Sequence, residues 1–266
     1  LNYAGGYDKA IDDEVLLDLN PYLDEPRNQP FHDNNTQMLY NAERRIARVR
    51  EAVGEDTDLC LELHRRLEPG LAVQLSARLE PYAPMFLEDP IRPDNFDEMA
   101  RVAQQCQIPI ATGERINSLF EFEMLLERGA CSYVRASIGV CGGFTGIKKI
   151  AALAEAHHKS LVPHNPLSPV TTNALLQFCA ATDNIAICEY PDPYAASTAD
   201  HLTGSGSKLR QVDMVTQIPK FEKGYVEIPE GPGLGIDLIS DVEERFPFRP
   251  HAVGTRLNLD GSICDQ

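Results

Sequence analysis

The stretch MFLEDPIRPDNFDEMARVAQQCQIPIATGER, residues 85–115, decides the fold of this chain. It contains two short apolar runs, MFLED and IPIATG, of the kind that forms buried β-strands. Between them, residues 96–105 have the amphipathic pattern of an α-helix, and Asn95 stands at the expected N-cap position. The order strand, helix, strand predicts a βα unit whose two strands are parallel neighbours in one sheet.

The same alternation extends over most of the chain. Six short runs are predicted strands: DLCLEL, MFLED, IPIATG, SYVRA, SLVPH and IAICE. Amphipathic helices are predicted at residues 36–52, 71–80, 96–105, 118–128, 146–159 and 171–181. Ser118 is the predicted N-cap of the helix at 118–128, and Gly129 is predicted to end it. A continuous βα repeat predicts an α/β fold with one parallel sheet.

Three glutamates are in phase with this repeat. Glu62, Glu88 and Glu114 each end an apolar run, and both intervals are 26 residues (88 − 62 and 114 − 88). His164 and Glu189 continue the rhythm, 25 residues apart (189 − 164). Parallel β/α barrels place catalytic groups at the C-terminal ends of strands that lie roughly 5 Å apart. Three carboxylates placed there would form a cage for a hard divalent cation, and Mg²⁺ fits that chemistry best. The alternative is that each glutamate caps the next helix or faces solvent, but three in phase favour the cage.

Composition excludes several classes of partner. The formal net charge of −16, from 40 acidic and 24 basic residues, argues against nucleic acid and anionic membrane as partners. No apolar stretch approaches the roughly 20 residues of a membrane span, and the N-terminus lacks the pattern of a signal peptide. The seven cysteines form no CxxC pair. Reduced cysteines in a cytoplasmic protein are the simplest account of this usage.

The 266 residues can form one large domain, or one domain with an appendage. Residues 1–35, rich in Pro, Asp and Asn, are predicted to form an irregular loop, and residues 36–204 the βα repeat. From residue 205 we expect a short strand, a Gly/Pro-rich turn and a segment that leaves the repeat to pack elsewhere. A complete β/α barrel has eight strands, so six predicted strands indicate a fragment or a chain that starts inside a larger architecture.

Several motifs resemble those of the enolase superfamily, and in particular its mandelate racemase/muconate lactonizing enzyme-like acid-sugar dehydratases, which act on galactonate, gluconate or mannonate. The motifs are Glu62-Leu63-His64-Arg65-Arg66, Phe86-Leu87-Glu88-Asp89-Pro90, Ala111-Thr112-Gly113-Glu114-Arg115, Gly142-Gly143-Phe144-Thr145, Val162-Pro163-His164-Asn165-Pro166, Glu189-Tyr190 and GYVEIPEGPGLGI near the end. The resemblance implies a TIM-like (β/α)7β barrel that follows an N-terminal capping domain. It also implies that this chain is incomplete. The chain would begin after the second barrel strand, and its segment 205–266 would pack back toward the capping domain.

The resemblance further implies a reaction and a set of roles. Glu62, Glu88 and Glu114 would hold Mg²⁺, which would stabilise an enediolate formed by removal of a proton beside a carboxylate. His64, on the same strand face as Glu62 by the i, i+2 rule, would be the general acid that protonates the departing 3-hydroxyl. The product would be a 2-keto-3-deoxy sugar acid.

The resemblance assigns the remaining polar positions less completely. His164 would be the general base if an Asp from the preceding strand held it, but that position, 23 residues after Glu114, is Ser137. His164 would then only bind substrate. Glu189 would contact the substrate or the acid/base machinery. Homo-oligomers of this chain are also expected.

Other polar residues near these motifs are expected to play structural or surface parts. Asp89 and Arg115 follow metal ligands and should point away from the ligand face. A plain tight turn is expected at Gly142-Gly143, and surface positions are expected for Lys148, Lys149, His157 and His158. Two other functions stay open. One is a non-catalytic relative that keeps the metal site, and the other is a metal-free barrel hydrolase that uses the carboxylate pair Glu88 and Glu189.

Overall fold

The computed structural model describes residues 35–166, 168–190 and 211–247. Nearly all of the predicted loop at 1–35, and large parts of the segment 205–266, therefore lie outside the described residues. The described part contains a five-stranded sheet in the order β1-β2-β3-β4-β5, and each neighbouring pair is parallel. The prediction of an α/β fold with a parallel sheet is confirmed.

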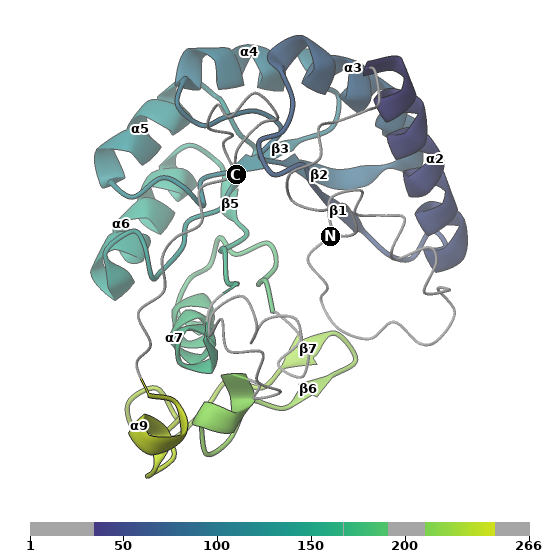
Figure 1. Cartoon of the computed structure of the whole chain (residues 1–266). Coiled ribbons are helices and arrows are strands. Elements are labelled where there is room, and N and C mark those ends of the chain that lie inside the picture. Colours follow the sequence, from purple (N-terminus) through teal and green to yellow (C-terminus); the bar gives the residue numbers. More distant parts are fainter. Residues whose placement is uncertain (1–34, 167, 191–210, 248–266) are drawn as a thin grey trace.

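The strands are short and follow one another directly in the sheet. They are β1 (Leu59–Glu62), β2 (Pro84–Glu88), β3 (Ile110–Thr112), β4 (Tyr133–Val134) and β5 (Ser160–Leu161). Each consecutive pair is joined by a helix, which is the connection that parallel strands require. Figure 1 shows these helices as an arc on the outer side of the strands.

The helices that form this outer layer are α2 (Asn35–Val53), α3 (Pro69–Leu79), α4 (Phe96–Gln105), α5 (Leu119–Glu127), α6 (Gly143–Ala156) and α7 (Pro169–Ala180). Each packs against the next one along the chain. The predicted caps are present. Asn95 Oδ1 accepts a hydrogen bond from the Glu98 backbone N–H at 3.0 Å, and Ser118 forms a capping box with Glu121. The helix predicted at 146–159 spans Gly143–Ala156, so it begins and ends three residues earlier, and Gly142 occupies its N-cap position.

Alternate residues of the strands belong to two different hydrophobic clusters, one on each face of the sheet. The larger one lies between strands and helices and includes Leu59, Leu87 and Val134. The smaller one consists of Phe86, Ala111 and Val162, with Cys60, Met85 and Tyr133 packed against it. Phe86 and Tyr133 have ring centroids 5.5 Å apart. Because side chains alternate along a strand, the second cluster marks the inner face of the sheet, where Glu62 and Glu88 must also point.

The sixth predicted strand is reduced to a single bridge. Ile185 pairs with Leu161 in parallel, through a hydrogen bond from Leu161 N–H to Asn184 O and one from Ala186 N–H to Leu161 O, both 2.8 Å. Beyond Ala186 the run continues without ladder bonds to Tyr190. The expectation of six barrel strands is therefore wrong for the described residues, which contain five and a bridge.

The segment 211–247 lies apart from the parallel sheet (Figure 1). It contains a short antiparallel hairpin, β6 (Phe221–Glu222) and β7 (Tyr225–Val226), and a four-residue helix, α9 (Val242–Arg245). Gln177 and Asn173 of α7 donate hydrogen bonds to the carbonyl groups of Pro229 and Leu234, at 2.6 and 3.1 Å. Among the described residues, no helix is both long and apolar enough to cross a membrane.

Candidate metal centre and active site

Glu62 and Glu88 are the last residues of two neighbouring strands. They are direct partners in the parallel register of β1 and β2. Cys60 and Phe86, two residues before them, belong to the inner-face cluster. Alternation along each strand therefore brings both carboxylates to the inner face at its C-terminal edge, one strand spacing apart.

Glu114 reaches the same place by a different route. β3 ends at Thr112, and the register partner of Glu88 is Ala111, so Glu114 lies beyond the strand. Gly113 has φ +136°, and a Cβ there would lie 2.9 Å from Phe122 Cε1 and 3.2 Å from the backbone nitrogen of Arg135. Only glycine fits this turn, which directs Glu114 toward the other two glutamates.

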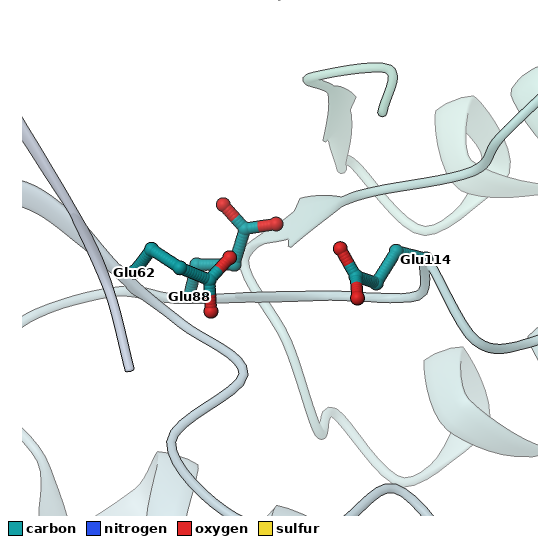
Figure 2. Close-up of side chains that lie close together, drawn as sticks. All are labelled: Glu62, Glu88 and Glu114. Carbon is teal, nitrogen blue, oxygen red and sulfur yellow. The ribbon is translucent and has the colours of Figure 1, made fainter. Parts of the chain in front are cut away.

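The three carboxylates form one cluster. One oxygen from each lies within 4.8 Å of the others, and Figure 2 shows Glu114 extending its carboxylate toward Glu62 and Glu88. In an octahedral Mg²⁺ site with bonds of about 2.1 Å, neighbouring oxygens lie about 3.0 Å apart and opposite ones about 4.2 Å, so the three carboxylates would close in by at most about 2 Å around the ion. A buried group of three acids is costly without a compensating cation, and an all-oxygen donor set suits Mg²⁺. The residues present therefore fit a hard divalent cation.

A buried arginine flanks the cluster on the side of β1. Arg65 Nη1 donates to Asp89 Oδ2 at 2.9 Å and also to Glu114 Oε1. Asp89 in turn accepts a hydrogen bond from Thr112 Oγ1 at 2.6 Å. Asp89 is not part of the cluster of glutamates, but it holds Arg65 against Glu114 and its charge acts on Glu62 and Glu88.

A second buried arginine flanks the cluster on the other side. Arg135 follows β4 and donates from Nε to Glu88 Oε1 and from Nη2 to Glu189 Oε2, the latter at 2.7 Å. The Asn165 backbone N–H also donates to Glu189 Oε2, at 2.8 Å. Glu189 is thus held beside the cluster without being a member of it.

The three glutamates differ in electrostatic surroundings. Burial and the nearby charges of Glu88, Asp89 and Glu114 raise the pKa of Glu62 to about 10. Burial also raises the pKa of Glu88, but Arg135 opposes it and the result is about 7. At Glu114, burial is outweighed by His164 and Arg65, which bring its pKa down to about 2. In the metal-free cluster, Glu62 therefore keeps its proton up to high pH, whereas Glu114 is ionised.

His64 lies at the site for a reason other than strand alternation. β1 ends at Glu62, and His64 has φ +52°, so the i, i+2 argument for its orientation is wrong. Its backbone N–H donates to Glu62 Oε1, and its Nε2 lies 3.1 Å from Arg65 Nη2. The left-handed turn at His64 and Arg65 brings both side chains beside the cluster.

His164 and Ser137 are neighbours, and each has one buried polar atom without a hydrogen-bond partner among the described residues. The ladder from β4 to β5 continues to a hydrogen bond from His164 N–H to Ala136 O at 3.1 Å, so Ser137 stands next to His164 at the strand ends. His164 Nε2 lies 2.9 Å from Glu114 Oε2. Within the described part of the chain, His164 Nδ1 and Ser137 Oγ are buried and have no protein hydrogen-bond partner. The structure thus places one imidazole nitrogen on Glu114, a member of the glutamate cluster, and leaves the other beside a serine.

The remaining residues singled out in the sequence lie away from the cluster. Arg115, Lys148, Lys149 and His158 are exposed, and His157 is half-buried at the end of α6. Gly142, with φ +95°, forms the N-cap of α6.

Sequence reasoning gave no role to Arg65 or Arg135. An arginine within an apolar run, as in SYVRA, is the signal that could have found Arg135, because a buried arginine requires acidic partners.

Comparison with known proteins agrees with this geometry. The family model described as enolase C-terminal domain-like matches residues 32–242. The chain belongs to this family. Two curated D-galactonate dehydratases show the relationship more closely. The protein from Ralstonia nicotianae is 36% identical over 196 residues, covering 73% of this chain and 49% of its own length. The protein from Cronobacter sakazakii is 34% identical over 225 residues, covering 83% and 56%.

Solved structures of the superfamily agree. An enolase from Agrobacterium radiobacter, bound to Na and L-malate, has a TM-score of 0.77 at 28% identity and covers 87% of this chain and 59% of its own. A mandelate racemase/muconate lactonizing enzyme from Jannaschia sp. CCS1 has a TM-score of 0.73 at 30% identity, covering 88% and 56%. The chain therefore has an incomplete form of the TIM-like barrel of the enolase superfamily and falls with its acid-sugar dehydratase group. It spans about half the length of the curated relatives it matches.

Proposed function

We propose that this chain carries the metal centre and part of the proton-transfer machinery of an acid-sugar dehydratase. The reaction is a β-elimination of water from an aldonate that yields a 2-keto-3-deoxy sugar acid. The observation that carries the proposal is the convergence of Glu62, Glu88 and Glu114 within 4.8 Å at the C-terminal edge of a parallel sheet. The similarity to D-galactonate dehydratases supports the substrate class.

Glu62, Glu88 and Glu114 would hold Mg²⁺. The bound cation would supply Lewis-acid polarisation of the substrate carboxylate, which makes the adjacent proton removable at neutral pH. Five acidic side chains lie in or beside the site, counting Asp89 and Glu189, against the two arginines Arg65 and Arg135. An anionic substrate therefore needs the additional positive charge of the metal.

His64 is the proposed general acid. It lies beside Glu62 and is half-buried, so it remains accessible to a leaving hydroxyl. His164 is proposed to bind and orient the substrate. Its Nδ1 has no carboxylate partner within the described residues, and the neighbouring Ser137 cannot stabilise an imidazolium as an aspartate would. The α-proton would then be taken by a group outside this pair.

A panel of acid sugars tests the proposal directly. Full-length protein is incubated with each aldonate and Mg²⁺, and the 2-keto-3-deoxy product is measured. We expect Mg²⁺-dependent product from at least one aldonate and none after EDTA treatment. Product formation that EDTA does not affect, or no product from any aldonate, contradicts the proposal.

A second candidate function is a relative that keeps the metal centre without turnover. The observation that favours it is that His164 Nδ1 and Ser137 Oγ are buried without a hydrogen-bond partner among the described residues. Solvent deuterium exchange distinguishes the two candidates, because a dehydratase exchanges the α-proton of its substrate and a binding protein does not. The third candidate, a hydrolase that uses Glu88 and Glu189, is less well supported. Arg135 pairs with both carboxylates, which leaves neither placed as a free general acid.

The setting of the protein is also proposed. The cysteines among the described residues carry no disulfide, which fits a cytoplasmic location. We further propose a small sugar acid as the partner and a homo-oligomer as the working form.

A further inference from the structure

Arg135 makes an unusually complete set of contacts. Its side chain is 2% exposed. Nε donates to Glu88 and Nη2 to Glu189, while Nη1 donates to the backbone carbonyls of Val162 and Pro163 at 2.9 and 3.4 Å. Each guanidinium nitrogen therefore has an acceptor, which is the condition under which a buried arginine is tolerated.

The contact with Glu88 crosses a whole strand. The sheet order is β2-β3-β4, so the Arg135 side chain must pass over β3 to reach an acid on β2. On the inner face, β3 and its turn present Ala111 and Gly113, two residues with little or no side chain. These small residues leave room for the Arg135 side chain to cross β3 and reach Glu88.

The contact links an acid outside the glutamate cluster to one inside it. Glu189 Oε2 is fixed by Arg135 and by the Asn165 backbone N–H. Glu88 Oε1 is held by the same guanidinium, and Glu88 is one of the three clustered glutamates. A displacement of Glu189 must therefore move the guanidinium and change the orientation of Glu88.

We propose that Arg135 is a positioning residue that sets the orientation of Glu88 and couples Glu189 to the metal centre. Glu189 then influences metal affinity although it does not belong to the cluster of ligands. This inference rests on the proposed metal site. The planar guanidinium, with donors in a fixed fork, suits the part, whereas a lysine ammonium is a single flexible point charge.

A purely structural part for Arg135 is the competing explanation, since its bonds to Val162 and Pro163 also brace two strands. The two explanations predict different measurable effects of substituting Arg135. A brace affects the free energy of unfolding and leaves the dissociation constant for Mg²⁺ unchanged. A positioning residue changes that dissociation constant, and its effect is not additive with that of Glu189.

Calorimetric titration of the full chain with Mg²⁺ alone separates them. The variants are Arg135→Met, Arg135→Lys, Glu189→Gln and the double variant Arg135→Met/Glu189→Gln. Arg101→Met is the control, because Arg101 pairs with Glu98 on the exposed side of α4. Supporting partners of metal ligands typically contribute about 10–100-fold to metal affinity.

We expect Arg135→Met to weaken Mg²⁺ binding by about tenfold or more and Arg135→Lys to weaken it less. Glu189→Gln should weaken it by roughly threefold or more, and the double variant should bind no worse than Arg135→Met. Arg101→Met should bind as the wild type does. If Arg135→Met fails to fold, as judged by circular dichroism, Arg135→Lys and Glu189→Gln still decide the question.

Three results overturn the inference. They are binding by the Arg135 variants within twofold of the wild type, unchanged binding by Glu189→Gln, and fully additive losses in the double variant. A wild-type protein that binds Mg²⁺ with the expected losses but dehydrates no aldonate leaves the inference intact and overturns only the proposed reaction. A wild-type protein that binds no Mg²⁺ overturns both.

Discussion

The two sides of the glutamate cluster are built alike at their arginines and differently at their histidines. On the β1 side, Arg65 joins Glu114 to Asp89, and on the β4 side, Arg135 joins Glu88 to Glu189. The histidines differ: His64 contacts Arg65, whereas the buried Nδ1 of His164, beside Ser137, has no partner in the part of the chain that the structure describes. Glu88 and Glu114 are thus each held by an arginine, while His164 Nδ1 lacks a partner among the described residues. Metal binding and proton transfer should therefore respond to different substitutions.

Glu88→Gln should have the largest effect, because Glu88 is both a cluster member and the partner of Arg135. Loss of one metal ligand should weaken Mg²⁺ binding by more than about 100-fold and lower kcat/KM by roughly three orders of magnitude or more. Calorimetry and steady-state kinetics measure both quantities. Glu98→Gln, on the exposed part of α4, is the control. Near-normal Mg²⁺ affinity in Glu88→Gln would show that the cluster is not the metal site.

The histidines offer the sharpest contrast between the two sides. His64→Asn should lower kcat by roughly 10²-fold or more, the usual contribution of a positioned acid. His164→Asn should raise KM at least as much as it lowers kcat, because it removes binding that is equal in ground and transition states. Steady-state kinetics of both variants on one aldonate tests this. If His164→Asn abolishes exchange of the α-proton with solvent deuterium while substrate affinity is kept, His164 is the base.

The pH dependence of the metal-free protein tests the electrostatic contrast within the cluster. The pKa of Glu62 rises from 4.5 to about 10 and that of Glu88 to about 7, so the folded state holds protons that the unfolded state releases. The free energy of unfolding should therefore fall as pH rises from about 4.5 toward 10. Glu114, with its pKa lowered to about 2, contributes in the opposite sense, but only below about 4.5.

Thermal unfolding in EDTA, between pH 5 and pH 9, measures this slope. Glu62→Gln should flatten it and raise the midpoint at pH 9 by several degrees, since about 1 kcal/mol corresponds to roughly 2–4 °C in a chain of this size. Stabilisation by Mg²⁺ should be larger at pH 9 than at pH 5. A midpoint that does not depend on pH above 5 contradicts the raised pKa of Glu62.

Ser137→Asp should have the smallest effect and removes the difference between the two sides. A carboxylate beside His164 Nδ1 would supply the missing partner, and we expect α-proton exchange to increase by about tenfold. Burial of a new acid should cost about 1–3 kcal/mol of stability. Ser137→Ala, which removes only a hydroxyl without a partner, should leave both exchange and stability nearly unchanged. Exchange that is equal in Ser137→Asp and Ser137→Ala would mean that His164 takes no part in proton transfer.

Local patterns in the sequence were sufficient for the helices, the strands up to β5 and two of the three cluster members. Glu62 and Glu88 could be placed because strand alternation and register determine where a strand-end residue points. Asn95 and Ser118 could be placed as caps because a cap depends only on residues within one turn. The length of the strand predicted at IAICE was overestimated, because a strand requires ladder hydrogen bonds that the sequence does not reveal.

Contacts between distant residues could not be read from these patterns. The equal spacing of Glu114 suggested a third strand-end position, yet the residue arrives through the turn at Gly113. His64 has a left-handed backbone, so its orientation does not follow strand alternation. Arg65 and Arg135 act on acids 24 to 54 positions away in the sequence, and those partnerships appear only once the sheet is assembled.

The turn at Gly113 also has a consequence for laboratory evolution. A library that randomises the exit of β3 would contain mostly inactive members, because any side chain at position 113 meets Phe122 and the backbone of Arg135. Codon 113 should therefore be held constant while neighbouring positions are diversified. The exit of β4 is the better place for variation, since the buried Ser137 Oγ has no hydrogen-bond partner among the described residues. New preferences among sugar acids are expected to arise more readily there, at the side of the site where Ser137 lies beside His164.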